Sequence, residues 1–300
     1  MPDHQSLIEL TIPAREADIG GMHVKRLLPW FKRRMLGPFI FLDHMGPAEY
    51  GIGEGLDVRP HPHIGLATVT YLFDGEIIHR DTLGSHQAIT PGAVNWMTAG
   101  QGISHSERTG VNERGHLHNV HGLQTWVALP KEFEEKSPEF FHYEAGILPF
   151  LDLKGVQLKV IAGEAFGMTS PTKTYSPLFY VEVKMRAGAT LELPPEYRER
   201  GAYIIQGNVR IGGEAIQQQT LPVFLPEGYV KIEAETDAHL VLLGGEPLPE
   251  KRFIWWNFVS TSQERIEQAK ADWTAGKFGI IPGDANDALP LPPDMGKPKS

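Results

Sequence analysis

LATVTYLF-DG-EIIH, residues 66–79, is the most informative stretch for the fold. The runs on either side of Asp74-Gly75 are rich in Thr, Val, Ile and aromatic residues, which favour extended strands. An Asp-Gly pair between two such runs is typical of a β-hairpin, because a type I′ turn needs positive φ at both central positions. The stretch therefore predicts two strands joined as a hairpin.

Strand signals of this kind recur along the chain. AVNWMT (93–98) follows a Pro-Gly turn, HGLQTWVAL (121–129) ends at a proline, and strand-rich sequence runs from about Val156 to Leu243. Gly and Pro supply 32 and 24 of the 300 residues, above the roughly 12% that the two average together. Pattern and composition predict an all-β protein with many tight turns.

The two halves of the chain resemble each other faintly. Tyr71–Gly75 (YLFDG) has a counterpart in Tyr203–Gly207 (YIIQG), and the same offset of 132 residues places His61-Pro-His63 on Leu193-Pro-Pro195. An internal repeat of this length predicts two copies of one β domain, the second without the histidines.

Charged and Pro-rich segments suggest where the chain divides. Residues 131–146 are charged and contain a proline, so we expect an N-terminal domain at 1–145 and a second domain at 146–281. The remaining residues, 282–300, are rich in Pro and are expected to form an extended or disordered tail.

One short helix is expected near 261–276, at the end of the second domain. Thr261 and Glu264 form a capping-box pattern there, an apolar stripe follows, and Gly276 is a suitable stop. We expect this helix to pack on a barrel.

Composition excludes several classes of protein. The absence of Cys excludes disulfides, iron–sulfur clusters and a thiol nucleophile. A net charge of −9 argues against direct nucleic-acid binding. No signal-peptide pattern and no apolar run near the roughly 18 residues of a membrane span is present. We expect a soluble, cytoplasmic protein without a membrane partner, and a monomer, since no coiled-coil pattern occurs.

Histidine is concentrated in the first half, where two pairs have metal-ligand spacing. His61 and His63 are two residues apart and would share one face of a strand, as would His105 and Glu107. Facing one another inside a barrel, the pairs would present three imidazoles and one carboxylate. That set suits a divalent transition metal and leaves positions open for substrate and O₂. Alternatively, His61 and His63 are ordinary surface or turn histidines beside a proline.

Other histidines compete with this interpretation. The polar loop GHLHNVHG, residues 115–122, offers a second candidate cluster for a metal or for a pocket rim: His116, His118 and His121. His79, Asp81 and His86 are interpreted as a hydrogen-bonded loop. Ligating histidines usually donate their second N–H to an oxygen, for which the candidate partners are Asp43, Asp81 and Gln124.

Several long motifs, in order along nearly the whole chain, resemble those of the pirins. They are FLDHMGP (41–47), HPHIG (61–65), TVTY (68–71), PGAVNWMTAGQGISHSE (91–107), HGLQTWV (121–127) and WWNFVS (255–260). The resemblance implies two cupin (jelly-roll type) β-barrels in tandem, followed by the short C-terminal helix. It also implies that only the N-terminal barrel binds metal, with the ligands His61, His63, His105 and Glu107.

The resemblance further implies one bound divalent transition metal. Fe(II) is favoured, and Zn, Mn, Co, Ni and Cu are alternatives. Several pirins cleave the flavonol quercetin with O₂, as quercetin 2,3-dioxygenases. We therefore expect a mononuclear, Fe(II)-type dioxygenase acting on quercetin or a related flavonol, with Glu107 accepting the 3-hydroxyl proton.

Two other interpretations stay open. Some pirins bind protein partners, so the alternative is a non-enzymatic, metal-dependent regulator that senses redox state. The third is a degenerate cupin that keeps metal for stability. An enzyme should carry a partly apolar pocket over the metal, for which the candidate side chains are Phe41, Met45, Trp96 and Trp126.

Overall fold

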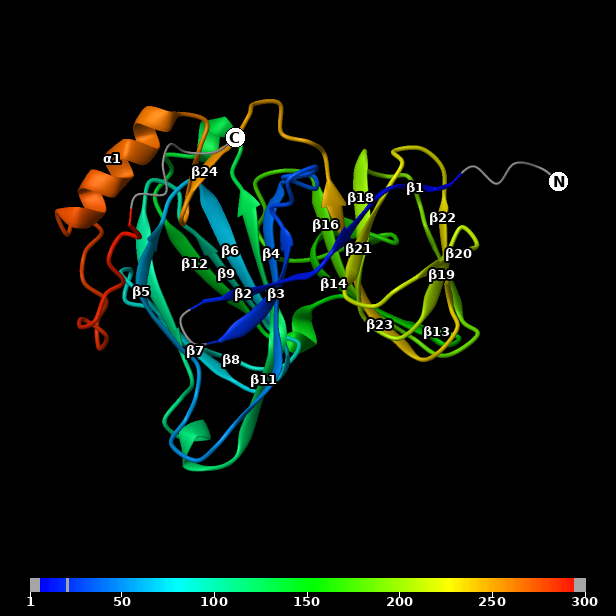
Figure 1. Cartoon of the computed structure of the whole chain (residues 1–300), viewed down its shortest axis with the longest axis horizontal. Helices are drawn as coiled ribbons and strands as arrows, with labels where there is room; N and C mark the ends of the chain where they lie inside the picture. Colours follow the sequence, from blue (N-terminus) through cyan, green and yellow to red (C-terminus); the bar gives the residue numbers. More distant parts are fainter. Residues whose placement is uncertain (1–5, 20–21, 294–300) are drawn as a thin grey trace. The chain divides into compact units, whose positions relative to one another are not determined.

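The structure is a computed structural model that describes residues 6–19 and 22–293 (Figure 1). These residues form two compact units, each assembled from separate segments of the chain. The first unit contains the described residues up to Glu16, then Lys25–Ile40 and Ile147–Pro247. The second contains the described residues of 17–24, then Phe41–Gly146 and those from Leu248 onward. The linear boundaries expected from the sequence, 1–145, 146–281 and 282–300, stay a prediction.

The second unit is a β-barrel that contains all the expected ligands, and we call it the histidine barrel. One of its sheets has the strand order β5-β10-β7-β8, and the other has the order β12-β9-β6-β11-β4-β3-β2. The bounds are β2 Arg15–Asp18, β3 His23–Leu28, β4 Phe39–Tyr50, β5 Asp57–His63, β6 Leu66–Asp74, β7 Ile77–Asp81, β8 His86–Ile89, β9 Val94–Thr98, β10 Ile103–Arg108, β11 His118–Ala128 and β12 Glu139–Tyr143. Short 3₁₀ turns lie at η1 Glu113–Gly115, η2 Lys131–Phe133 and η3 Ala145–Ile147.

The hairpin expected at Asp74-Gly75 is wrong, although both of its strands exist. β6 pairs with β9 and β11, whereas β7 pairs with β8 and β10 in the other sheet. The chain therefore changes sheets at this turn. Gly75 has φ +85°, and a Cβ there would lie 2.0 Å from the carbonyl oxygen of Asn119, so glycine is needed for close approach.

The first unit is a barrel with the same strand order, and we call it the apolar barrel. Its small sheet, β17-β22-β19-β20, repeats β5-β10-β7-β8, and its large sheet contains β21-β18-β23-β16 where the histidine barrel has β9-β6-β11-β4. The predicted repeat is thereby confirmed. The bounds are β1 Ile8–Pro13, β13 Phe150–Leu153, β14 Val156–Ala165, β15 Met168–Thr169, β16 Leu178–Met185, β17 Thr190–Leu193, β18 Glu199–Gln206, β19 Val209–Ile211, β20 Glu214–Ile216, β21 Thr220–Phe224, β22 Val230–Ala234 and β23 Ala238–Gly245.

Aliphatic side chains fill the interior of the apolar barrel. Leu193, the counterpart of His61, is buried in a cluster with Leu191, Val230 and Ile232 on the paired strands β17 and β22. Among its described residues, this barrel offers no group of three metal-ligating side chains. The strand pattern has been kept, while the interior chemistry differs.

The C-terminal segment packs on a barrel, as expected, and that barrel is the histidine barrel. It contains β24 (Phe253–Trp255), β25 (Phe258–Ser260) and helix α1 (Gln263–Thr274), and the helix buries Ile266 and Ala269 against Ile64 and Phe258. The expected cap is wrong by one residue, because the Ser262 side chain accepts from the Arg265 amide. Thr261 instead donates to the buried Glu134 carboxylate.

The described part of the Pro-rich tail has no regular element but is anchored. Arg108, on β10, donates two hydrogen bonds to Asp284, at 2.7 and 2.9 Å. The Leu289 amide donates to the Pro60 carbonyl at 2.8 Å, and the Trp273 indole donates to the Leu289 carbonyl. Residues 294–300 of the tail lie outside the described residues.

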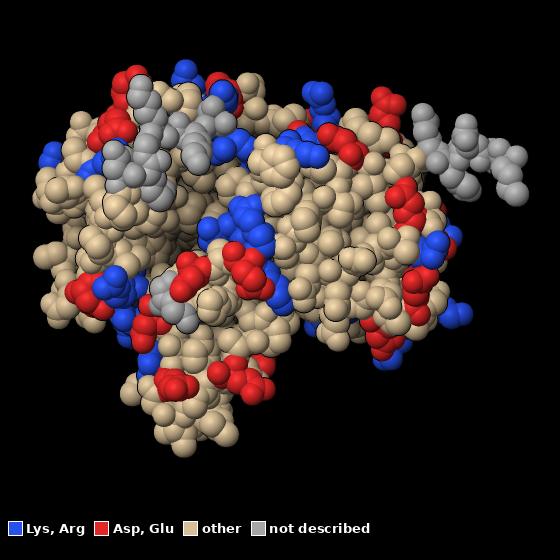
Figure 2. Space-filling model, in the orientation of Figure 1, with Lys and Arg blue, Asp and Glu red and all other residues tan. Residues whose placement is uncertain are grey.

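Acidic and basic side chains are interspersed on the face drawn in Figure 2. No helix within the described residues is long and apolar enough to cross a membrane.

Candidate metal centre

The candidate site begins with the pairing of two neighbouring strands. β5 and β10 are antiparallel, and His105 lies opposite His61 in their register. A bulge falls between His105 and Glu107, so that Glu107 lies opposite Val58. His61 and His63 are two residues apart on β5, which directs both side chains to one face of the sheet.

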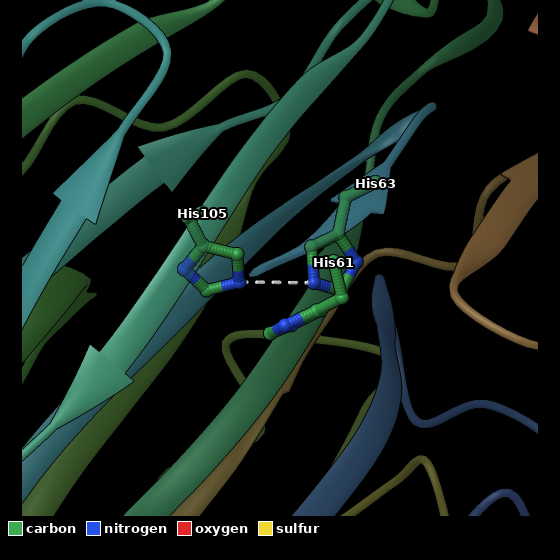
Figure 3. A group of neighbouring side chains, drawn as sticks. All are labelled: His61, His63 and His105. Carbon is green, nitrogen blue, oxygen red and sulfur yellow. Dashed lines mark hydrogen bonds between the residues drawn. The ribbon is translucent and has the colours of Figure 1, made fainter. Parts of the chain in front are cut away.

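Three imidazoles meet inside the histidine barrel (Figure 3). One nitrogen each of His61, His63 and His105 lies within 4.8 Å of the other two. The Nε2 atoms of His63 and His105 are 3.1 Å apart. The exposed fractions of the three residues are 7%, 1% and 1%. The structure thus brings together the three histidines predicted from their spacing.

Backbone carbonyls orient two of these imidazoles. The Nδ1 atom of His61 is 2.8 Å from the Arg59 carbonyl, and that of His63 is 3.2 Å from the Asn257 carbonyl. A carbonyl oxygen only accepts, so each Nδ1 carries the proton and each Nε2 keeps a lone pair. Burial also lowers the pKa of all three histidines, which favours their neutral, ligating form.

Glu107 is not part of the set of mutually close donor atoms. Its Oε1 accepts from the Thr70 hydroxyl at 2.9 Å, and its Oε2 accepts from the Gln124 amide at 2.6 Å. Both donors come from the large sheet, β6 and β11. They hold a buried carboxylate beside the three imidazoles, and the role of Glu107 as fourth ligand stays a prediction.

An aromatic wall borders the histidines. The Trp126 ring meets the His63 ring edge to face at 5.1 Å and stacks on Phe41 at 4.0 Å with an interplanar angle of 12°. Trp126 is two residues beyond Gln124 on β11, so the two side chains share the face that reaches Glu107. Its buried indole N–H has no hydrogen-bond partner within the described part of the chain. Met45 belongs instead to an apolar cluster with Leu72.

The competing histidine cluster is not assembled. His118 stacks on Tyr50, and its Nδ1 contacts the His116 carbonyl. His121 lies against His44, with 2.9 Å between their Nε2 atoms. Within the described ranges, the three loop histidines form no group that could hold a metal.

Several contacts at the centre were not predicted from the sequence. The Asn257 carbonyl leaves no signal, because every residue has one. Thr70 could have been noticed, since Thr68 and Thr70 are polar residues at strand period in an apolar run. Of the candidate partners, Gln124 contacts Glu107, and Asp81 contacts His79 rather than one of the three clustered histidines.

The donor set fits a borderline divalent metal. At least two imidazole lone pairs converge with a third imidazole in a buried site, and a carboxylate lies beside them. Imidazole and carboxylate ligands suit Fe, Zn, Cu, Ni and Mn ions, and no thiolate is present to select a softer metal.

Comparison with known proteins matches both barrels to one family. The family model "Pirin" matches residues 21–127, and "Pirin C-terminal cupin domain" matches residues 180–279. The chain is 51% identical to a pirin-like protein of Caulobacter vibrioides, over 95% of this chain and 100% of that protein. It is 34% identical to human pirin, over 91% of this chain and 94% of that protein.

A crystal structure shows the same architecture. The structure of quercetin 2,3-dioxygenase from Acinetobacter baumannii matches with a TM-score of 0.88 and 35% identity, covering 96% of this chain and 97% of that one.

Proposed function

This chain belongs to the pirin family of two-barrel cupin proteins, and on that basis we propose that it is a mononuclear metal dioxygenase that cleaves quercetin or a related flavonol with O₂. The observation that carries the proposal is that the buried side chains of His61, His63 and His105 bring their ring nitrogens close together. The 35% identity to a quercetin 2,3-dioxygenase over nearly the whole chain supports it.

In this proposal His61, His63, His105 and Glu107 hold one divalent metal, with Fe(II) favoured over Zn, Mn, Co, Ni and Cu. A metal bound there supplies Lewis-acid chemistry, which lowers the pKa of a hydroxyl group that it contacts. Three neutral imidazoles and one carboxylate leave a divalent ion with net positive charge, which favours an anionic flavonolate oxygen at the site.

Glu107 is proposed as the base that accepts the flavonol 3-hydroxyl proton. A general base must lie within hydrogen-bond reach of that proton. Thr70 and Gln124 donate to separate oxygens of Glu107, so the carboxylate is held in place and keeps lone pairs available.

Phe41 and Trp126 are proposed to hold the aromatic substrate. Their rings stack on one another next to His63, so a planar substrate bound at the metal would meet an apolar surface there. A planar flavonol would gain contact area on such a surface, and the unpartnered Trp126 N–H can donate to one of its oxygens.

The test is oxygen uptake with quercetin after anaerobic purification and elemental analysis, run beside His61→Ala. One metal per chain, with oxygen consumption that His61→Ala abolishes, would support the proposal. Metal bound at full occupancy without consumption, across several reconstituted metals, would reject the enzymatic role.

A metal-dependent regulator is the second candidate, because one part of the histidine barrel exposes an ordered apolar tip. Ile52, Val111 and Leu117 are 73%, 84% and 75% exposed. Their two loops are tied by the Gly53 amide, which donates to the Arg114 carbonyl at 2.8 Å. Ordered, exposed apolar side chains of this kind suit a protein partner. The cytoplasmic location and monomeric state expected from the sequence stay predictions.

A further inference from the structure

A fourth buried histidine lies directly behind the three imidazoles of the candidate metal centre. His79, on β7, is 3% exposed, and its Nδ1 is 3.4 Å from the Nδ1 of His105. This is the nitrogen of His105 that faces away from His63. His79 stacks on Phe140, with ring centroids 4.3 Å apart and planes 10° apart. Its ring is therefore fixed at the back of the site.

Asp81 anchors the other nitrogen of His79. The Nε2 of His79 is 2.9 Å from Oδ2 of Asp81, a side chain with no exposed surface. The amides of Leu83 and Ser85 donate to Oδ1 of the same carboxylate, at 2.9 and 3.0 Å. Three donors therefore converge on this one carboxylate, an arrangement that favours its ionised form over the protonated form. Asp81 is thus an ionised acceptor.

The proton positions follow from this anchor. An ionised carboxylate only accepts, so Nε2 of His79 carries the proton. When Nε2 alone is protonated, Nδ1 of His79 has a lone pair and accepts from the Nδ1–H of His105. Nδ1 of His105 must therefore carry its proton, which leaves the lone pair of its Nε2 pointing at His63.

We infer that His79 and Asp81 are positioning residues that hold His105 in the Nδ1–H form and so make its Nε2 a metal ligand. They do for His105 what the Arg59 and Asn257 carbonyls do for His61 and His63. The inference rests on the proposed metal site but not on the proposed reaction. Outer hydrogen-bond partners of this kind fix both the tautomer and the orientation of a ligating histidine.

Asp81→Asn is the sharpest test. Asn has the same shape as Asp, but it can reverse the donor and acceptor roles in the hydrogen bonds from residue 81 to His79 and from His79 to His105. The oxygen of the introduced side-chain amide would stay with the two loop amides, and its NH₂ group would then face His79 and donate. His79 would become the donor to His105, whose proton would move to Nε2. We expect zinc affinity, measured by chelator competition, to fall by about 10- to 100-fold.

The second readout is the tautomer of His105, measured by long-range ¹H–¹⁵N NMR in metal-free protein labelled at histidine. The Nδ1–H form should dominate in the parent and be lost in Asp81→Asn. Glu182→Gln is the matched control, since it makes the same change beside His239, 2.9 Å away, in the apolar barrel. It should alter neither zinc affinity nor the His105 signals.

An unchanged tautomer and a zinc affinity within twofold of the parent would overturn the inference. If Asp81→Asn does not fold, His79→Gln and His79→Leu take its place. Gln can accept from His105 and should retain more zinc affinity than Leu, which offers no acceptor. Equal losses in these two variants would also overturn it. None of these measurements needs oxygenase activity, so the failure of the proposed reaction would be seen separately.

Discussion

The Asn257 carbonyl accepts from His63, 194 residues earlier in the chain, at 3.2 Å. The C-terminal segment reaches this position because β25 runs beside the end of β5, with Phe258 opposite Ile64. The Val259 amide also donates to the Ile64 carbonyl, at 3.2 Å. A segment outside the main barrel strands therefore completes the orientation of a candidate ligand.

Gly65→Ala should disturb this contact and weaken the site. Gly65 has φ +68°, and a Cβ there would lie 2.0 Å from the Val259 carbonyl oxygen. A left-handed backbone alone costs an L-residue about 1–2 kcal/mol, and the backbone clash should add to that and displace the Asn257 segment. We expect a loss of stability above about 2 kcal/mol in urea unfolding, the scale of a severe core defect, together with lower zinc affinity.

Gly53→Ala is the control for Gly65→Ala. Gly53 also has a positive φ, +87°, but a Cβ there meets nothing within 4 Å. Gly53→Ala should therefore lose only the stability that a left-handed backbone costs an L-residue, and it should leave zinc binding intact. Equal zinc affinities in the two variants would show that the contact with Val259 does not support the metal site.

Glu107→Gln should lower the rate of turnover far more than it lowers metal occupancy. The amide cannot accept the 3-hydroxyl proton as a carboxylate does, and general-base catalysis contributes about 10²–10⁴ in rate. Oxygen uptake with quercetin measures the rate, and elemental analysis of the same sample measures occupancy. Full activity in this variant would remove Glu107 from the role of base.

Trp126→Phe should separate the two functions proposed for this side chain. Phe keeps an aromatic ring beside Phe41 but has no N–H, so we expect flavonol binding to weaken by about fivefold, the value of one ordinary hydrogen bond. Trp126→Ala should weaken binding further because the wall itself is lost. Absorbance titration of quercetin into zinc-loaded protein without O₂ measures both. Unchanged affinity in both variants would place the substrate elsewhere.

The stability that the protein gains from anchoring the tail should depend on pH through the ionisation of Asp284. Burial would raise the pKa of this carboxyl, but hydrogen bonds, chiefly from Arg108, outweigh it and hold the pKa below the usual 3.8. A carboxyl whose pKa is lowered by folding stabilises the protein above its unfolded-state pKa and loses that effect as the pH falls toward its folded-state pKa. We expect Asp284→Asn to cost about 1 kcal/mol near neutral pH.

That cost should stay constant from about pH 7 to about pH 5 and shrink only below the ordinary value of 3.8. Urea unfolding of the parent and of Asp284→Asn across this range measures it. A change centred at roughly pH 6 to 7 would instead implicate a histidine.

Local patterns in the sequence were sufficient for much of the fold and for three residues of the site. Period-two spacing placed His61 and His63 on one face, and the strand register then brought His105 opposite. The 132-residue offset identified the repeat, because each barrel needs the same order of strands and turns. The same offset places Leu193-Pro-Pro195 on His61-Pro-His63, which predicted a second barrel without these histidines.

Sequence alone determined the strands, the repeat and the two pairs of candidate ligands, because alternation and spacing are properties of neighbouring residues. Tertiary structure decided which sheet each strand joins, so that β6 and β7 part at Gly75 instead of forming a hairpin. It also decided which group contacts the Nδ1 atom of each imidazole. These groups are two backbone carbonyls and the His79–Asp81 pair. A carbonyl is common to every residue, and a buried His–Asp pair has the same sequence pattern as any polar loop, so only the packing of distant segments could select them.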